Sequence, residues 1–119
     1  MDMSVLIVDD HAPFRASARR MLELDGYDVV AEAEDGASGL ALAEELEPEL
    51  VLLDVALPDL SGFEVAERLA ASTDAAVVLV SSRDPSDFGT RLKRSPVRGF
   101  IPKDQLSTER IHALLGDRK

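Results

Sequence analysis

The sequence predicts an α/β fold, in which one doubly wound sheet of five parallel strands is covered by helices on both faces. Two observations lead to this prediction. Short apolar runs without alternation, such as SVLIV at residues 4–8 and LVLL at residues 50–53, suit strands that are buried on both faces. Segments with apolar residues at helical spacing lie between these runs, and regular alternation of strand and helix implies parallel strands joined by right-handed crossovers.

The first half of the chain provides two strand–helix units. Residues 4–8 form the first strand, and the helix after it has Pro13 in its first turn, where the missing N–H group costs little. Gly26 ends this helix and precedes a strand over residues 27–33. Asp35 is the expected N-cap of the second helix. The apolar face of that helix consists of Leu40, Ala43 and Leu46.

The third unit is the strand at residues 50–53 and the helix that begins at Gly62. Ser61 and Glu64 form the S-x-x-E pattern of a capping box, in which each side chain accepts a hydrogen bond from the backbone N–H of the other residue. This pattern predicts a helix start at Gly62 and a helix of about ten residues. The hydrophobic staple that accompanies the box is formed by Leu60 and Val65.

The fourth unit is a strand at residues 75–80 and a helix that begins at Pro85. Asp84 precedes the proline as the expected N-cap. This helix has a thin apolar face, and Gly89 within it costs about 1 kcal/mol relative to alanine. We therefore expect it to belong to the less stable part of the structure. Its apolar pair is Phe88 and Leu92.

The fifth unit is a short strand at residues 99–102 and a helix that opens at Ser107. No repeat, linker or low-complexity tract interrupts the five units. The expected staple of the last helix is Leu106 with Ile111, and its inward-facing residues are Ile111, Leu114 and Leu115.

Composition limits the possible functions. A chain of 119 residues suits one domain with a core of its own. A formal charge of −10 argues against a nucleic-acid-binding surface, which needs clustered Lys and Arg. The absence of cysteine excludes disulfides and thiolate chemistry and agrees with a cytoplasmic location. The apolar run at residues 5–8 is too short to be a signal peptide or to span a membrane.

Polar residues stand where the strands end. Asp9 and Asp10 follow the first strand, Asp54 the third, Ser81 the fourth and Lys103 the fifth. Asp54 by itself could simply end a strand. The carboxyl ends of parallel strands meet at one edge of the sheet, however, so these side chains are expected to converge. Three carboxylates in one pocket repel one another, and Mg²⁺, which prefers hard oxygen ligands, would relieve that repulsion. The lysine and the serine hydroxyl then remain for a phosphoryl group.

These residues resemble the receiver domain of bacterial two-component response regulators, over essentially the full length of the chain. The order of the functional residues is that of the family: first the acidic pair Asp9 and Asp10, then Asp54, Ser81 and Lys103. Asp54, Pro58 and Gly62 match its D-x-x-x-P-x-x-x-G pattern, and Phe100 stands at its aromatic position. The resemblance implies a CheY-like, flavodoxin-like sandwich and one receiver domain over residues 1–119.

The resemblance also assigns roles. Asp54 would be the phosphoacceptor, and the donor would be a histidine kinase or a phosphotransfer protein. Mg²⁺ (or Mn²⁺) would be held by the acidic pair, most directly by Asp10 and otherwise by Asp9, together with Asp54 and the backbone carbonyl of Ala56. Lys103 would neutralise charge on the transferring group. Such a protein is a switch with at most slow self-dephosphorylation, and not a turnover enzyme.

The switch that the resemblance implies begins at Ser81, which would move to the phosphoryl group, and at Phe100, which would turn inward. The family more often has Thr and Tyr at these positions. The change would reach the helix from Pro85, the strand at residues 99–102 and the last helix, where we expect a downstream protein partner; a phosphorylation-dependent dimer remains open. The helix from Pro85 carries Arg91, Lys93 and Arg94, although solvated surface charges explain these cations nearly as well.

Other functions are less compatible with the sequence. The chain could be the receiver portion of a longer DNA-binding transcriptional regulator, or a degenerate receiver that binds without phosphorylation, although the intact acidic set argues against the latter. A haloacid-dehalogenase phosphatase needs D-x-D-G-T/V after its first strand, where this chain has VDDHAP. A P-loop enzyme needs G-x-x-x-x-G-K-[ST], which is absent.

Overall fold

The computed structural model describes residues 3–116, so the ends of the predicted domain, residues 1 and 119, lie outside the described residues. Five parallel strands form one sheet in the order β2-β1-β3-β4-β5. The predicted α/β class is therefore confirmed. The strands are β1 (Ser4–Val8), β2 (Asp28–Ala33), β3 (Leu50–Asp54), β4 (Ala76–Ser81) and β5 (Gly99–Pro102). The helices are α1 (Ala12–Leu24), α2 (Gly36–Leu46), α3 (Gly62–Ser72), α4 (Thr90–Arg94) and α5 (Thr108–Leu115), with 3₁₀ turns η1 (Pro85–Phe88) and η2 (Lys103–Gln105).

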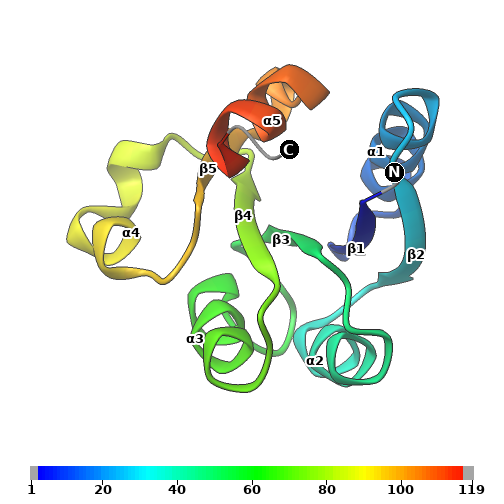
Figure 1. The fold of residues 1–119 in the computed structure, drawn as a ribbon. Helices are drawn as coiled ribbons and strands as arrows, with labels where there is room; N and C mark the ends of the chain where they lie inside the picture. The colour runs from blue at the N-terminus through cyan, green and yellow to red at the C-terminus, as the bar shows by residue number, and fades with distance from the viewer. Residues whose placement is uncertain (1–2, 117–119) are drawn as a thin grey trace.

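Helices cover both faces of the sheet, so the fold is a three-layer sandwich (Figure 1). On one face α1 and α5 pack through Ala18, Leu22, Ile111 and Leu115 onto one set of strand side chains. On the other face α2 and α3 bury residues such as Ala43 against the alternate side chains of the same strands. The central strands β1 and β3 are apolar on both faces for this reason, which accounts for their unbroken apolar runs. Within residues 3–116, no helix has both the length and the apolar character needed to cross a membrane.

The predicted caps set the helix starts. The Ser61 hydroxyl accepts a hydrogen bond from the Glu64 N–H, and the Glu64 carboxylate accepts one from the Ser61 N–H, which confirms the capping box. Asp35 caps α2 by accepting from Ser38 N–H, and Ser107 caps α5 in the same way. The first helix ends at Leu24, and after the C-cap Asp25 the predicted stop Gly26 adopts φ +89°, a value typical of the glycine that follows a helix end.

The region after β4 differs from the prediction of one continuous helix. Asp84 does cap a helical start at Pro85, but that segment is the short 3₁₀ turn η1. Gly89 then adopts φ +56°, a left-handed value that interrupts the helical backbone, and α4 forms only beyond it. None of the five residues of α4 is buried. The thin apolar face therefore supports two short segments and not one helix.

The apolar face predicted for α2 is one turn too long. Leu40 and Ala43 pack against the core, whereas Leu46 is 41% exposed. The C-terminal end of α2 borders a polar surface groove of about 550 Å³, which the end of α3 and the start of β4 also line.

Candidate functional site

The polar residues predicted at the strand ends do converge at one edge of the sheet. The registers align the ends of neighbouring strands, with Val8 beside Leu53, Asp54 beside Val80 and Ser81 beside Pro102. Among the described residues, the buried polar side chains are Asp9, Asp54 and Ser81, which are at most 4% exposed. Burial of polar groups at the sheet edge, rather than within either core, indicates a functional pocket.

Three carboxylates in this pocket have the arrangement of a metal site. Asp9, Asp10 and Asp54 each offer one oxygen, and these oxygens lie within 4.8 Å of one another. Asp9 and Asp54 are buried and Asp10 is exposed, so the cluster opens to solvent on the Asp10 side. Oδ2 of Asp9 is buried without a hydrogen-bond donor among the described residues. Carboxylates are hard oxygen ligands, and three of them this close together fit a divalent cation such as Mg²⁺ or Mn²⁺.

Lys103 is the cationic member of the pocket. Its Nζ lies 2.7 Å from Oδ2 of Asp9 and 3.5 Å from Oδ2 of Asp54. The contact with Asp9 is an ion pair whose angles do not meet those of a hydrogen bond. The same ammonium lies 4.6 Å from the centroid of the Phe14 ring, within the range of a cation–π interaction. The lysine is thus held between two carboxylates and one aromatic face, close to where a group bound to Asp54 would lie.

Asp54 has an unusual protonation equilibrium. Burial, together with the negative charge of Asp9, raises the pKa of Asp54 to about 6, although Lys103 and the N–H of Ala56 oppose this increase. The Ala56 N–H donates to Oδ1 of Asp54 over 3.4 Å, which is a long contact. A carboxylate whose charge is poorly compensated is one that further positive charge would stabilise.

The predicted switch residues lie in two different places. Ser81 is in the pocket, where its Oγ accepts a hydrogen bond from the N–H of Arg83. Phe100 is half-buried on the face of the sheet that α2 and α3 cover, and its ring lies 5.8 Å from the ring of Phe88. Phe88 also contacts the ring of Phe63, at 5.5 Å. Phe100 is thus connected to η1 and to the start of α3.

The loop between Asp54 and α3 is tightly folded. The N–H of Gly62 donates to the carbonyl of Val55 over 2.7 Å, and Ala56 forms an isolated bridge with Ser61. Asp59, in the middle of the loop, accepts hydrogen bonds at the N-terminus of α2, from the N–H groups of Gly36 and Ala37. These two bonds hold the pKa of Asp59 below its ordinary value. The loop that carries the predicted ligand carbonyl of Ala56 is therefore anchored to a neighbouring helix.

Sequence reasoning missed three residues near the pocket. Phe14, in the first turn of α1, contacts Lys103 through its ring. Arg15 donates from Nη1 to the carbonyl of Asp9 over 2.6 Å, and Asp59 anchors the loop. A sequence signal was available only for Phe14, whose helical position facing the sheet could have placed it near the strand ends.

Comparisons with known proteins agree with this geometry. The family model described as the response regulator receiver domain matches residues 5–115. BvgA of Bordetella pertussis, named as a transcription regulator of virulence factors, is 37% identical over 110 residues, which are 92% of this chain and 53% of BvgA. The response regulator GacA of Pseudomonas protegens is 38% identical over 112 residues, with the same shares of 92% and 53%. The chain therefore spans about half the length of these curated relatives.

A solved structure extends the comparison to three dimensions. The signal receiver domain of the response regulator NarL from Mycobacterium tuberculosis is 34% identical, with a TM-score of 0.83 over 96% of this chain and 94% of that one. Sequence, fold and pocket thus agree, and the resemblance noted in the sequence is confirmed. The chain belongs to the response regulator receiver domain family, whose members are signalling switches.

Proposed function

We propose that this domain accepts a phosphoryl group on Asp54 from a histidine kinase or a phosphotransfer protein. A carboxylate oxygen of Asp54 would bond to phosphorus while the P–N bond of the donor phosphohistidine breaks, and the electron pair of that bond would leave with the imidazole. The product is an acyl phosphate. The observation that supports this most is the pocket itself, where Asp54 lies beside two further carboxylates and Lys103.

The residues around Asp54 suit the charge changes of this reaction. The ligands of Mg²⁺ or Mn²⁺ would be Asp54 together with Asp9, Asp10 and the backbone carbonyl of Ala56. The cation, when bound, neutralises charge on the transferring group, which is most of what phosphoryl transfer requires of a protein. Lys103 would exchange its contact with Asp54 for one with a phosphoryl oxygen. The hydroxyl of Ser81 would donate a hydrogen bond to a second phosphoryl oxygen.

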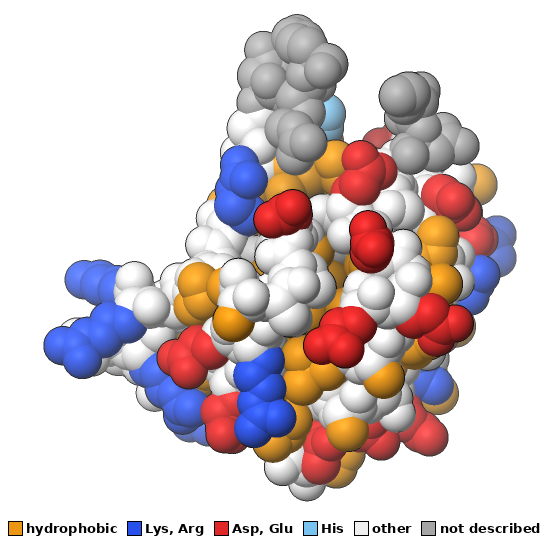
Figure 2. Space-filling view, turned by 60° about the horizontal axis from the view of Figure 1, so that its bottom comes forward, with side chains coloured by type: hydrophobic (Ala, Val, Ile, Leu, Met, Phe, Trp, Pro, Cys, Tyr) orange, Lys and Arg blue, Asp and Glu red, His pale blue; other side chains and the backbone are white. Residues whose placement is uncertain are grey.

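Phosphorylation would alter the surface formed by α4, β5 and α5. The added group carries about −1.5 to −2 charges. Ser81 would turn toward it and Phe100 would move inward, which would disturb the contact between Phe100 and Phe88 and so the η1–α4 segment. In Figure 2, Lys and Arg side chains gather at the edge of the molecule occupied by α4, and Asp and Glu predominate over the rest of that view. A downstream protein, or a second copy of the domain, is the partner we propose for this surface.

A second proposal follows from the relatives. BvgA is named as a transcription regulator. BvgA and GacA are each about twice as long as the segment that matches this chain. We propose that this domain can serve as the receiver portion of such a regulator, so that its surface acts on an output domain in the cytoplasm. DNA would then be bound by the output domain, and the receiver would act only as a switch with at most slow self-dephosphorylation.

Intact mass spectrometry tests the main proposal. Incubation with acetyl phosphate and Mg²⁺ should add one phosphoryl group to the wild type and none to Asp54→Asn. Addition at an equal rate by the variant, or by the wild type in excess EDTA, would contradict it. Backbone NMR shifts with and without beryllofluoride test the output surface. Changes confined to α1 and α2, with Phe100 and α4 unaffected, would place the output elsewhere.

A further inference from the structure

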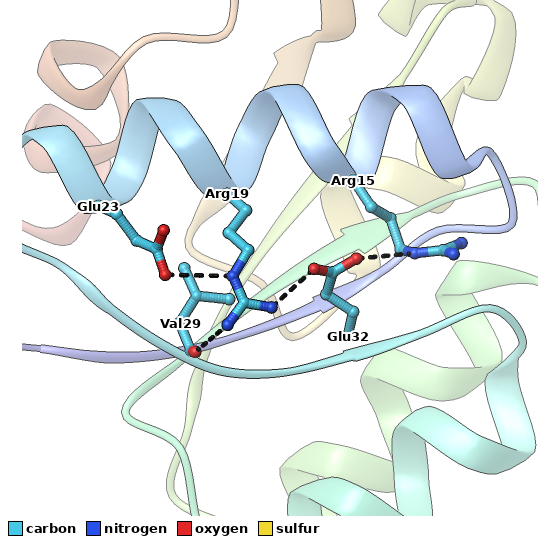
Figure 3. A network of polar contacts seen from close by, with 5 residues as sticks. All are labelled: Arg15, Arg19, Glu23, Val29 and Glu32. Carbon is cyan, nitrogen blue, oxygen red and sulfur yellow. Dashed lines mark hydrogen bonds and ion pairs between the residues drawn. The ribbon is translucent and has the colours of Figure 1, made fainter.

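A network of ion pairs joins α1 to β2 (Figure 3). Glu32 is at its centre: one carboxylate oxygen lies 3.0 Å from Nε of Arg15 and the other 2.8 Å from Nη1 of Arg19. Arg19 also pairs with Glu23 at 3.1 Å and donates to the carbonyl of Val29. Hydrogen bonds from Arg19 and, to a lesser extent, Arg15 keep the pKa of Glu32 below its ordinary value although burial opposes this, so the glutamate stays charged.

Arg15 connects this network to the pocket. While its Nε binds Glu32, its Nη1 donates to the backbone carbonyl of Asp9 over 2.6 Å. The side chain is 17% exposed and both contacts are partly buried, which reduces the competition from water. Arg19 resembles Arg15 in charge and also binds Glu32, but its remaining contacts lead away from the pocket, to Glu23 and Val29.

The contact with Arg15 completes the restraint of Asp9. Oδ1 of Asp9 accepts from the N–H of His11 over 2.8 Å, and Oδ2 pairs with Lys103. The carbonyl held by Arg15 belongs to the peptide group that joins Asp9 to Asp10. Asp10 is exposed, so packing does not restrain its carboxylate, and the orientation of this peptide determines where the Asp10 side chain begins relative to Asp9.

We propose that Arg15 is a positioning residue for the metal ligands Asp9 and Asp10, and that Glu32 orients it. This inference rests on the proposed function, since it assumes that the carboxylates bind a divalent cation. A guanidinium can hold Glu32 through Nε and the carbonyl through Nη1 at once, whereas a lysine offers one ammonium on a flexible stem. The pairing with Glu32 also balances the charge of Arg15, so the arginine orients the ligands with little repulsion toward a cation.

The test compares Arg15→Lys with Arg19→Lys, two variants that keep the charge and weaken contacts with the same glutamate. Mg²⁺ affinity of the unphosphorylated protein is measured by calorimetry, and stability by urea denaturation. Loss of a residue that orients metal ligands typically costs 10–100-fold in metal affinity. Arg15→Lys should weaken Mg²⁺ binding about tenfold, at the low end of that range, and Arg19→Lys should leave it within about twofold of wild type. Both variants can lose stability, so the difference in affinity separates positioning from support of the fold.

A second readout needs no metal. The NMR shifts of the Asp10 and His11 amides should change in metal-free Arg15→Lys and stay the same in Arg19→Lys. If Arg15→Lys does not fold, Glu32→Asp replaces it, because the shorter carboxylate keeps its charge but cannot span both arginines; it should weaken Mg²⁺ binding several-fold. Equal affinities in wild type and Arg15→Lys, or equal losses in both arginine variants, would overturn the inference and leave the proposed function intact. A wild type that binds no Mg²⁺ would overturn both.

Discussion

The carbonyl oxygen of Asp54 lies so close to Gly62 that it would clash with the Cβ atom of any other residue at position 62. A Cβ on Gly62 would overlap that oxygen and would lie 2.7 Å from Cα of Val55. The neighbouring atoms are backbone, so they cannot rotate away. The first residue of α3 must therefore lack a side chain if the helix is to begin directly against the end of β3.

Replacement of this glycine should be costly. We expect Gly62→Ala to lower the free energy of unfolding by about 3 kcal/mol, because the chain of β3 or α3 must shift. Urea denaturation measures this. Gly99→Ala is the matched control: the three atoms nearest to its Cβ would all belong to the side chain of Leu114, which can change rotamer, so its cost should be clearly smaller. Equal costs for the two variants would show that the close approach to Asp54 is not what restricts position 62.

The raised pKa of Asp54 predicts a pH-dependent effect of Asp54→Asn. The pKa is about 6 in the folded protein and near 3.8 for an unperturbed aspartate. Above pH 6 the carboxylate is charged in the folded and in the unfolded protein, and the burial of its charge destabilises the fold. Below about pH 4 it is protonated in both states, and this destabilisation vanishes. Without divalent cations, Asp54→Asn should therefore be more stable than wild type at pH 8, by on the order of 2–3 kcal/mol, and this gain should disappear as the pH falls from 7 to 4.

Urea denaturation in EDTA across this pH range measures the gain. Asp84→Asn provides a control of opposite sign. Hydrogen bonds from Ser86 hold the pKa of Asp84 below its ordinary value, so its contribution is present at neutral pH and is lost in acid. That variant should be less stable than wild type at pH 7, with a gap that narrows as the pH falls. An Asp54→Asn protein no more stable than wild type at pH 8 would contradict the electrostatic explanation.

The anchor between Asp59 and α2 should be visible in hydrogen exchange. Asp59→Ala removes the acceptor of the Gly36 and Ala37 N–H groups at a helix N-terminus, where a negative charge is favourable. The amides of Gly36 and Ala37 should exchange faster in the variant. The amide of Ser38 should be unchanged, because Asp35 accepts its hydrogen bond. Uniform acceleration of all three amides would indicate general destabilisation of α2 instead.

The short helix α4 should depend on Arg91. Its guanidinium lies 4.7 Å from the centroid of the Phe63 ring and donates to the hydroxyl of Ser61, which ties α4 to the start of α3. A cation–π contact at an exposed site contributes about 0.5–1 kcal/mol, so Arg91→Ala should speed amide exchange in α4 by up to about fivefold. Lys93→Ala removes the same charge from the same helix and should have little effect. If the two variants behave alike, the three cations of α4 are equivalent surface charges.

Much of the fold could be predicted because the determining interactions are local. The strand at Ser4–Val8, the cap at Asp35 and the capping box at Ser61 each depend on residues a few positions apart, and each was predicted correctly. The pocket could also be predicted, although Asp54 and Lys103 are 49 positions apart, since a parallel sheet brings all its strand ends to one edge. Their precise roles in phosphoryl transfer remain predictions.

Only the tertiary structure decided how these groups are held. The guanidinium of Arg15 reaches the carbonyl of Asp9, the carboxylate of Asp59 caps a helix 23 residues earlier, and the ring of Phe14 faces Lys103. The left-handed backbone at Gly89, which divides the predicted helix into η1 and α4, is likewise seen only in the structure. An apolar run or a cap has a sequence signature because its partners are close along the chain. A contact between a flexible polar side chain and a distant backbone group has none, because its geometry exists only after the layers have packed.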